Sequence, residues 1–235
     1  MYKTESILNL NNESFDWNKF FDSQNIEKYL NQSDFKRIVL ELRQHFNEKK
    51  ANMTFVLGKM LLNIFSNISI VNPNILELGA GIGFLSRFLL NYIGGNSLLV
   101  DNCDGAYKRF LDIGTSLNRN LKYHQEDIFN LKLEQKYDII CSFGLIEHFS
   151  DKRKILDAHK KYLTDKGYIL LLVPLDTILS RVYWIIHPEK NFGYRELLTT
   201  DEVKQIVKEN GLKLIKYSVS NNYSYDFIAV LCQAE

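Results

Sequence analysis

From Asn74 onward, short apolar runs alternate with segments that carry apolar residues at helical spacing. Runs this continuous are typical of parallel strands buried on both faces, because a half-exposed strand would alternate apolar and polar residues. The intervening helices supply the crossovers that parallel strands need. The pattern therefore predicts an α/β fold with a doubly wound sheet. Its first five strands are expected at Ile75–Leu78, Ser97–Val100, Leu121–His124, Tyr137–Ser142 and Gly167–Val173.

Two later helices carry recognisable start signals. Ser150 can cap a helix that runs to Leu163. Thr199 and Glu202 have the spacing of a capping box, and Gly211 can close the helix that this box opens. Each signal predicts a helix on one face of the sheet.

The chain ends in two further strand patterns, at about residues 212–219 and 224–232. Asn221-Asn222 lies between them and suits a tight turn. We therefore predict an antiparallel hairpin at this end of the sheet.

Residues 1–72 have a different, helical character. Apolar residues recur at steps of three and four from Phe35 to Phe46 and again from Phe55 to Ile64. Pro73 ends this pattern, since the residue before a proline is pushed out of helical geometry. We predict an N-terminal helical cap at residues 1–72 and the main domain at residues 73–235.

Charge and cysteine content exclude several classes of protein. Twenty-nine Lys+Arg against 28 Asp+Glu leave a formal charge of +1, so no basic excess points to a nucleic-acid partner. Three cysteines, far apart in the sequence, make neither a disulfide framework nor a zinc site.

The longest apolar run, Tyr168–Leu175, is much shorter than a membrane-spanning helix, which needs about 20 residues. The N-terminal sequence shows no signal pattern, so we expect a cytoplasmic protein without a membrane partner.

A glycine-rich turn follows the first strand, in the sequence Glu77-Leu78-Gly79-Ala80-Gly81-Ile82-Gly83. Glycines allow a tight bend and a close approach of a ligand to the backbone, because no Cβ intervenes. The dinucleotide fingerprint would require glycine at Phe84, which disfavours an NAD-dependent oxidoreductase. Either a different nucleotide-like ligand or close helix–strand packing would explain the turn.

Acidic residues follow the next two strands. Asp101 stands where a carboxylate can accept hydrogen bonds from both hydroxyls of a ribose. Asp127 follows the third strand and could accept a hydrogen bond from an adenine amine. Simpler roles are open to both, as a helix N-terminal acid for Asp101 and a solvated loop acid for Asp127. Ligands in parallel sheets bind at the carboxyl ends of the strands, so the segment after Tyr137–Ser142 should face the same site.

Five motifs in this order resemble those of the class I S-adenosylmethionine-dependent methyltransferases: ILELGAGIG, LLVDNCD, QEDI, YDIICSFGLIEHF and LTDKGYILLLVP. The resemblance covers about residues 70–235. It implies a Rossmann-like sheet of seven strands in the order 3-2-1-4-5-7-6 with the last strand antiparallel, in agreement with the predicted hairpin. It also implies S-adenosyl-L-methionine as cofactor and S-adenosyl-L-homocysteine as product.

The resemblance further implies which residues bind the cofactor. Asp101 would bind the ribose with Asn102 beside the adenine, Asp127 and Ile128 would contact the adenine edge, and the glycines with Glu77 behind them would form the methionine side. Ser142 and Phe143 would lie near the sulfonium. The full set is Glu77, Gly79, Gly81, Gly83, Asp101, Asn102, Asp127, Ile128, Ser142 and Phe143.

Glu147-His148 resembles part of an E-x-x-E-H sequence that binds a divalent ion in some relatives. Gly144 stands where the first glutamate would be, so no metal is expected. His148 is a candidate general base, because an imidazole can take a proton near neutral pH. It could equally orient the loop.

The connection at about residues 175–200 covers the substrate in many members of the family. Here it is aromatic and carries His187, Tyr194 and Arg195, which we expect to bind the methyl acceptor, although packing alone would explain them. Tyr183, Trp184 and Phe192 belong to the same group of aromatic residues.

The sequence therefore predicts methyl transfer from S-adenosyl-L-methionine to an oxygen or nitrogen atom of a small molecule, by direct in-line displacement. An RNA or protein methyltransferase and a non-catalytic methyltransferase-like subunit are the alternatives. The identity of the acceptor and the oligomeric state are left open.

Overall fold

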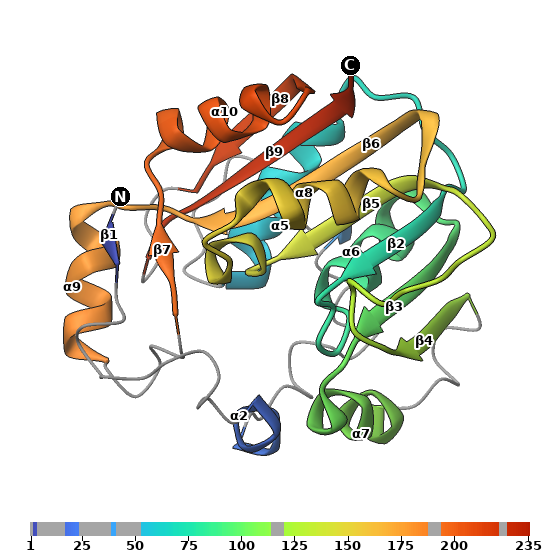
Figure 1. Cartoon of the computed structure of the whole chain (residues 1–235), viewed down its shortest axis with the longest axis horizontal. Helices are drawn as coiled ribbons and strands as arrows, with labels where there is room; N and C mark the ends of the chain where they lie inside the picture. The colour runs from blue at the N-terminus through green and yellow to red at the C-terminus, as the bar shows by residue number, and fades with distance from the viewer. Residues whose placement is uncertain are drawn as a thin grey trace.

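Seven strands form one sheet in the computed structural model, which describes residues 2–3, 17–23, 39–40, 53–113, 120–187, 194–220 and 225–235. They are β2 (Asn74–Leu78), β3 (Asn96–Asp101), β4 (Leu121–Gln125), β5 (Tyr137–Phe143), β6 (Leu163–Pro174), β8 (Leu212–Val219) and β9 (Phe227–Ala234). Their order is β4-β3-β2-β5-β6-β9-β8, and β9 runs antiparallel to both of its neighbours (Figure 1). Numbered along the chain within this sheet, the order is 3-2-1-4-5-7-6. The predicted fold class and strand order are confirmed.

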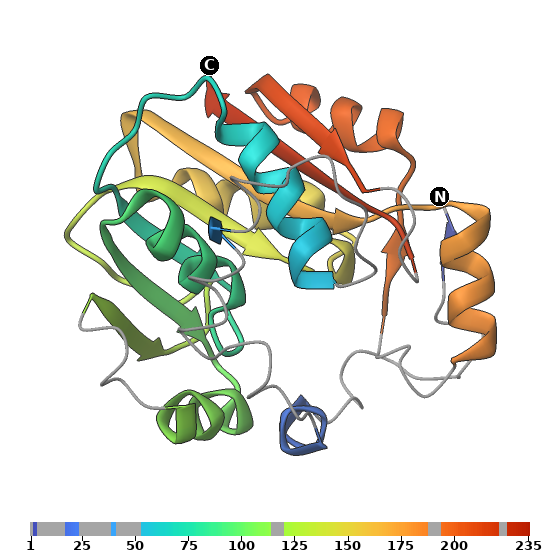
Figure 2. The same cartoon turned by 180° about the vertical axis from the view of Figure 1, so that it is seen from behind.

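Helices cover both faces of this sheet. On one face lie α5 (Met53–Phe65) and α6 (Phe84–Ile93), seen in front in Figure 2. On the other lie α8 (Lys152–Lys160) and α10 (Thr200–Glu209), seen in front in Figure 1. A further helix, α7 (Asp104–Ile113), packs beside β4 at the edge of the sheet. The arrangement is the doubly wound one that the alternating pattern predicted.

The two cores explain why the strands are continuously apolar. In β6, Leu170 and Leu172 pack in the core beneath α5 and α6, whereas Ile169, Leu171 and Val173 pack in the core on the opposite face. Successive residues of a strand point to opposite faces, so a strand covered on both sides must be apolar at every position. All five side chains are buried.

The boundaries of α8 and β6 differ from the sequence prediction. Asp151 rather than Ser150 caps α8, with its carboxylate accepting the backbone N–H of Lys154 at 2.9 Å. The helix ends at Lys160, and β6 already begins at Leu163, which pairs with Tyr137 before the register shifts. Two neighbouring cap-forming residues cannot be ranked without the tertiary structure, and the polar residues after Leu163 hide the start of the strand.

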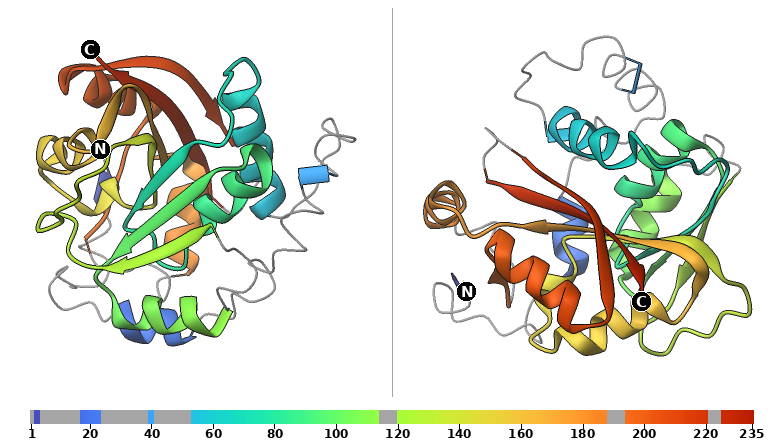
Figure 3. Two further views of the ribbon diagram at one scale, coloured as in Figure 1. Left: turned by 90° about the vertical axis from the view of Figure 1, so that its right-hand side faces the viewer. Right: turned by 90° about the horizontal axis from the view of Figure 1, so that it is seen from above.

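The N-terminal segment contributes α2 (Trp17–Ser23), which lies against α7 (Figure 3). The Asn18 side chain accepts the backbone N–H of Gly105 at 2.7 Å, and Arg109 donates to the Phe21 carbonyl at 3.2 Å. Of the predicted helix through Phe35–Phe46, only residues 39 and 40 are described, in helical conformation. These hydrogen bonds fix α2 over the carboxyl ends of β2 and β3.

The connection after β6 contains α9 (Ile178–Ile186) and β7 (Glu196–Leu197). The short strand β1 (Tyr2–Lys3) pairs with β7, which ties the beginning of the chain to this connection. Trp184 on α9 is buried, whereas Ile178, Ile185 and Ile186 on its outer face are exposed.

Within the described ranges, no helix is long and apolar enough to cross a membrane. The predicted turn at Asn221-Asn222 lies outside the described residues.

The capping box predicted at Thr199 is present, since Thr199 accepts the N–H of Glu202 and Glu202 accepts that of Thr199. Replacing Thr199 with Ala should lower the free energy of unfolding by about 1 kcal/mol, because a backbone donor loses its partner. Urea denaturation measures the change. Thr200→Ala, one residue later in the same helix, is the matched control and should cost clearly less.

Candidate active site

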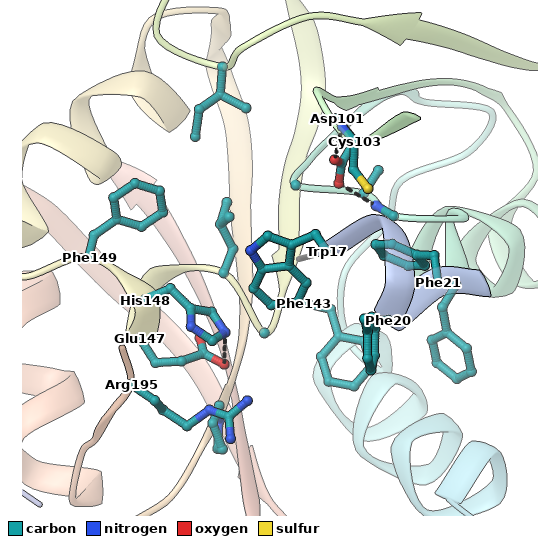
Figure 4. Close-up of a pocket in the computed structure, with 18 of the residues that line it drawn as sticks. Trp17, Phe20, Phe21, Asp101, Cys103, Phe143, Glu147, His148, Phe149 and Arg195 are labelled. Carbon is teal, nitrogen blue, oxygen red and sulfur yellow. Dashed lines mark hydrogen bonds and ion pairs between the residues drawn. The ribbon is translucent and has the colours of Figure 1, made fainter. Parts of the chain in front are cut away.

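A cavity of about 780 Å³ opens at the carboxyl ends of the strands. One side is formed by the glycine turn after β2, the end of β3 and the loop after β4. The other is formed by the short 3-10 helix η3 (Ile146–His148) and the connection that carries α9. Figure 4 shows Asp101 and Cys103 on one side, Glu147, His148 and Arg195 on the other, and Trp17 with Phe143 between them.

The glycine turn needs glycine at each of its three positions. Gly79, Gly81 and Gly83 have φ values of 59°, 53° and 80°, which residues other than glycine rarely adopt. A Cβ at Gly81 would lie 2.9 Å from the Phe21 ring, and one at Gly83 would lie 2.4 Å from Leu99. Gly79 and Gly81 line the cavity, whereas Gly83 packs against β3 at the start of α6.

Glu77 lies beneath this turn and not in the cavity wall. It is 1% exposed, and its carboxylate accepts the backbone N–H of Ser86 at 2.8 Å. Burial raises the pKa of Glu77 from 4.5 to about 7, although the Ser86 hydrogen bonds and the nearby Arg87 oppose the shift. Glu77 thus supports the turn from beneath and does not itself line the cavity.

Asp101 ends β3 and lines the cavity. One of its carboxylate oxygens accepts the N–H of Gly81 at 2.8 Å, and the other accepts the N–H of Cys103 at 2.9 Å. Burial raises its pKa, and the backbone hydrogen bonds oppose this shift. A carboxylate offers about four lone pairs, so Asp101 is held in place and keeps accepting capacity for a ligand.

Three further predicted cofactor residues, Asn102, Asp127 and Ile128, also line the cavity. Asp127 accepts the backbone N–H of Phe129 at 2.7 Å, which fixes the loop after β4. The structure therefore brings together residues from the ends of three adjacent strands, as expected for a parallel sheet.

Ser142 and Phe143 separate at the end of β5. Phe143 lines the cavity, with its ring 5.6 Å from that of Phe84 and 5.5 Å from that of Phe227. Ser142 is 1% exposed, and its hydroxyl is 3.0 Å from His159 Nε2 on α8. Because successive strand residues face opposite sides, the Ser142 side chain points into the core and not toward the cavity.

The far side of the cavity holds three neighbouring ionisable residues: Glu147 and Arg195, which are buried, and His148, which is partly buried. His148 Nδ1 lies 2.6 Å from the Tyr194 carbonyl oxygen, and His148 Nε2 lies 3.9 Å from the Glu147 carboxylate. Burial and the positive charge of Arg195 lower the pKa of His148 to about 3. Burial raises the pKa of Glu147 to about 7, against the opposing effects of Arg195 and Lys152.

A second ion pair lies next to this group. Lys152 Nζ is 2.8 Å from the Glu196 carboxylate, and Lys152 also donates to the Ile146 carbonyl at 3.1 Å. The Tyr194 hydroxyl donates to Glu196. These contacts hold η3 against β7 and so fix the orientation of Glu147 and His148.

Of the residues predicted to bind the acceptor, the structure places Arg195 in the cavity wall, with its guanidinium 4.2 Å from the Trp184 ring. His187 caps the end of α9 and packs against the Tyr183 ring instead, and the Tyr194 carbonyl oxygen lies next to His148 Nδ1. Neither is among the described cavity-lining residues. Phe192 lies outside the described residues.

Several cavity residues were not predicted. Trp17, Phe20 and Phe21 of α2 and Tyr225 and Phe227 near β9 all line it. The helical spacing of Trp17, Phe20 and Phe21 indicates an apolar face, but only the contacts of α2 with α7 place that face over the cavity. In the part of the chain that the structure describes, no group of three or more His, Cys, Asp or Glu residues could hold a metal ion.

Comparison with known proteins identifies the family. A family model described as a methyltransferase domain matches residues 30–217, most of the chain. The chain belongs to the methyltransferase-domain family. The resemblance drawn from the five motifs is confirmed.

Relatives of this methyltransferase domain differ in substrate. The mitochondrial ubiquinone biosynthesis O-methyltransferase of Dictyostelium discoideum is 26% identical over 63% of this chain and 49% of its own length. A methylenetetrahydrofolate–tRNA-(uracil-5-)-methyltransferase of Mycoplasma capricolum is 22% identical over 86% of this chain and 51% of its own length. The chain thus spans about half the length of these curated relatives.

The fold also matches solved methyltransferases. The crystal structure of an S-adenosylmethionine-dependent methyltransferase from Clostridium acetobutylicum superimposes with a TM-score of 0.59 at 12% identity. The match covers 83% of this chain and 96% of that one. At this identity the comparison supports the fold.

Glu77→Gln should change stability in a way that depends on pH. The folded protein keeps a proton on Glu77 that the unfolded chain has already released, so raising the pH from 4.5 through about 7 destabilises the native protein. The variant lacks this loss. Its free energy of unfolding, relative to the native protein, should rise by up to roughly 3 kcal/mol between about pH 5 and about pH 8.

Urea unfolding at the two pH values measures this difference. Glu134→Gln, in an exposed loop, is the matched control and should show no such change. An equal pH dependence in the native protein and the Glu77 variant would refute the raised pKa.

Proposed function

We propose that the chain is an S-adenosyl-L-methionine-dependent methyltransferase whose methyl acceptor is a small molecule, modified at an oxygen or nitrogen atom. One observation carries this proposal. The same cavity reaches from the glycine turn and Asp101 to Glu147, His148 and Arg195. A cofactor in the first half and an acceptor in the second would meet beside Phe143.

The residues of the first half suit S-adenosyl-L-methionine. The glycine turn lets the cofactor approach the backbone at Gly79 and Gly81. Asp101 presents an oriented carboxylate to the ribose, and Asp127 lies on the neighbouring loop for the adenine. Phe143 would form an apolar wall near the sulfonium.

The bound cofactor supplies a methyl carbon that is already activated by a positively charged sulfur. The chain must therefore align the acceptor with that carbon and exclude water, and alignment supplies much of the acceleration. Trp17, Phe20 and Phe21 on α2 and Trp184 on α9 form apolar walls suited to this task. The ionisable groups on the far side orient the acceptor and take up its proton.

A small acceptor is favoured over a nucleic acid by the aromatic lining of the cavity and by the charge balance of the chain. The acceptor half is walled by aromatic side chains, and the sequence carries a formal charge of +1. An RNA substrate would need an excess of Lys and Arg for its phosphates. The relative from Dictyostelium discoideum, named for O-methylation in ubiquinone biosynthesis, supports the same choice, whereas the relative named for tRNA supports the alternative.

Asp101→Ala should weaken binding of S-adenosyl-L-methionine and S-adenosyl-L-homocysteine by about 10- to 100-fold. A charged hydrogen bond to the ribose would be lost, which costs on the order of 1.5–3 kcal/mol. Calorimetry measures both affinities. Asp112→Ala, at an exposed position on α7, is the matched control and should bind like the native protein.

The same measurements decide among the alternatives. If the native protein binds neither compound, the proposed function is wrong. If it binds both but methylates tRNA and no small acceptor, the RNA alternative replaces it. Cofactor binding without transfer to any acceptor would point to a non-catalytic subunit.

A further inference from the structure

The Glu147 carboxyl has an unusual environment on the acceptor side of the cavity. The residue is 2% exposed and lies in the wall, on η3. One of its oxygens, Oε1, is 3.9 Å from His148 Nε2. The other, Oε2, is buried and has no hydrogen-bond partner within the described structure. A buried oxygen without a partner costs free energy, so folding alone does not account for this atom.

His148, beside it, is already oriented by the chain. The Tyr194 carbonyl oxygen 2.6 Å away can only accept a hydrogen bond, which assigns the imidazole proton to Nδ1. The contact fixes the ring, and edge-on packing of the Trp17 ring at 5.4 Å supports it. Burial and Arg195 hold the pKa of His148 at about 3, so this imidazole takes a proton poorly at neutral pH.

The charges that face Glu147 come from several elements. Lys152 of α8 is paired with Glu196 of β7 at 2.8 Å, and Arg195 is the stronger of the two cations that act on the Glu147 carboxylate. Figure 4 shows the carboxyl of Glu147 between the His148 ring and the Arg195 guanidinium. The titratable or charged groups around this site are His148, Lys152, Tyr183, Tyr194, Arg195, Glu196 and Tyr225.

We propose that Glu147 receives the methyl acceptor, by accepting a hydrogen bond from a hydroxyl group on a flat, largely apolar molecule, and takes up the hydroxyl proton during transfer. This role of Glu147 rests on the proposed methyltransferase function and adds the chemical class of the methyl acceptor. As the acceptor oxygen bonds to the methyl carbon, the carbon–sulfur bond breaks with its electron pair on sulfur, and the proton passes to the Glu147 carboxylate. It then leaves to solvent with product release.

A neutral hydroxyl fits this position better than an ammonium group. Arg195 would repel a second cation beside Glu147, whereas its guanidinium stabilises the negative charge that develops on a hydroxyl oxygen. With a pKa raised to about 7, the carboxyl of Glu147 binds a proton more readily than His148 does. The assignment of the proton acceptor therefore moves from His148 to Glu147.

The walls around this position suit a flat apolar body. The rings of Trp184 and Tyr225 lie 4.8 Å apart, those of Tyr225 and Phe227 4.6 Å, and those of Phe227 and Phe143 5.5 Å. The rings of these pairs are tilted relative to each other by 46°, 47° and 62°, and aromatic rings attract one another in such arrangements. This row of rings runs from the Arg195 side of the cavity to the place proposed for the sulfonium.

Three probes that share the naphthalene ring test the proposal: 2-naphthol, naphthalene and 2-naphthylmethylamine. Calorimetry in the presence of S-adenosyl-L-homocysteine measures each affinity between about pH 5 and about pH 8. We expect 2-naphthol to bind more tightly as the pH rises and Glu147 ionises, with a midpoint near 7. Naphthalene should show no such change, and the amine should bind more weakly than 2-naphthol.

Variants separate the two candidate residues. Glu147→Gln should weaken the binding of 2-naphthol about tenfold at about pH 8, because a charged hydrogen bond is lost. The affinity of this variant for 2-naphthol should no longer depend on pH. Its affinity for naphthalene should stay within about twofold. His148→Gln should keep the pH dependence. Thermal unfolding checks both variants, and the pH series on the native protein remains a test if Glu147→Gln does not fold.

Opposite results would overturn the proposal. These are unchanged 2-naphthol binding in Glu147→Gln, a pH dependence that disappears in His148→Gln instead, or tighter binding of the amine. Binding of S-adenosyl-L-homocysteine is measured first in every protein. If the native protein does not bind S-adenosyl-L-homocysteine, the proposed function is contradicted. If it binds this compound and any of the three results is found, only the role of Glu147 is contradicted.

Discussion

The site depends on how sharply β2 turns into α6. Three glycines in the left-handed region make the turn possible, and two carboxylates hold it from opposite sides. Glu77 binds the N–H of Ser86 from below, and Asp101 binds the N–H of Gly81 from β3. The same hydrogen bond that shapes the turn thus orients the carboxylate proposed to bind the ribose. Any change in this turn would move both the backbone and the acid.

Buried ionisable residues are concentrated around the site. Glu77 with Arg87 and Glu147 with Arg195 are almost inaccessible to water, where ionisation is costly. Glu77 is satisfied by the backbone, so its burial serves the fold. Glu147 keeps one carboxylate oxygen without a hydrogen-bond partner among the described residues. Its burial therefore does not stabilise the fold in the way that the burial of Glu77 does. This contrast separates a supporting carboxyl from one available to a ligand.

Much of the fold could be read from local patterns, because doubly covered strands and capping boxes have local signatures. The first strands and the Thr199 capping box follow from such signals, whereas the choice of Asp151 over Ser150 depends on tertiary packing. The convergence of the glycine turn, Asp101 and Asp127 on one cavity was predictable for the same reason, since these residues follow directly from strand ends. A cover from the N-terminal helices was expected, but the α2 residues that line the cavity and the environment of Glu147 were not, because they arise from contacts such as that of Asn18 with Gly105, far apart in sequence.

The position of the tryptophans has a practical consequence. The chain has only two, and both Trp17 and Trp184 line the cavity. One packs against His148 and the other against Arg195. The indole emission of the native protein therefore originates entirely at the site, with no background from elsewhere. The protein carries a built-in optical reporter of cavity occupancy, which would allow candidate acceptors to be screened without labels or a coupled assay.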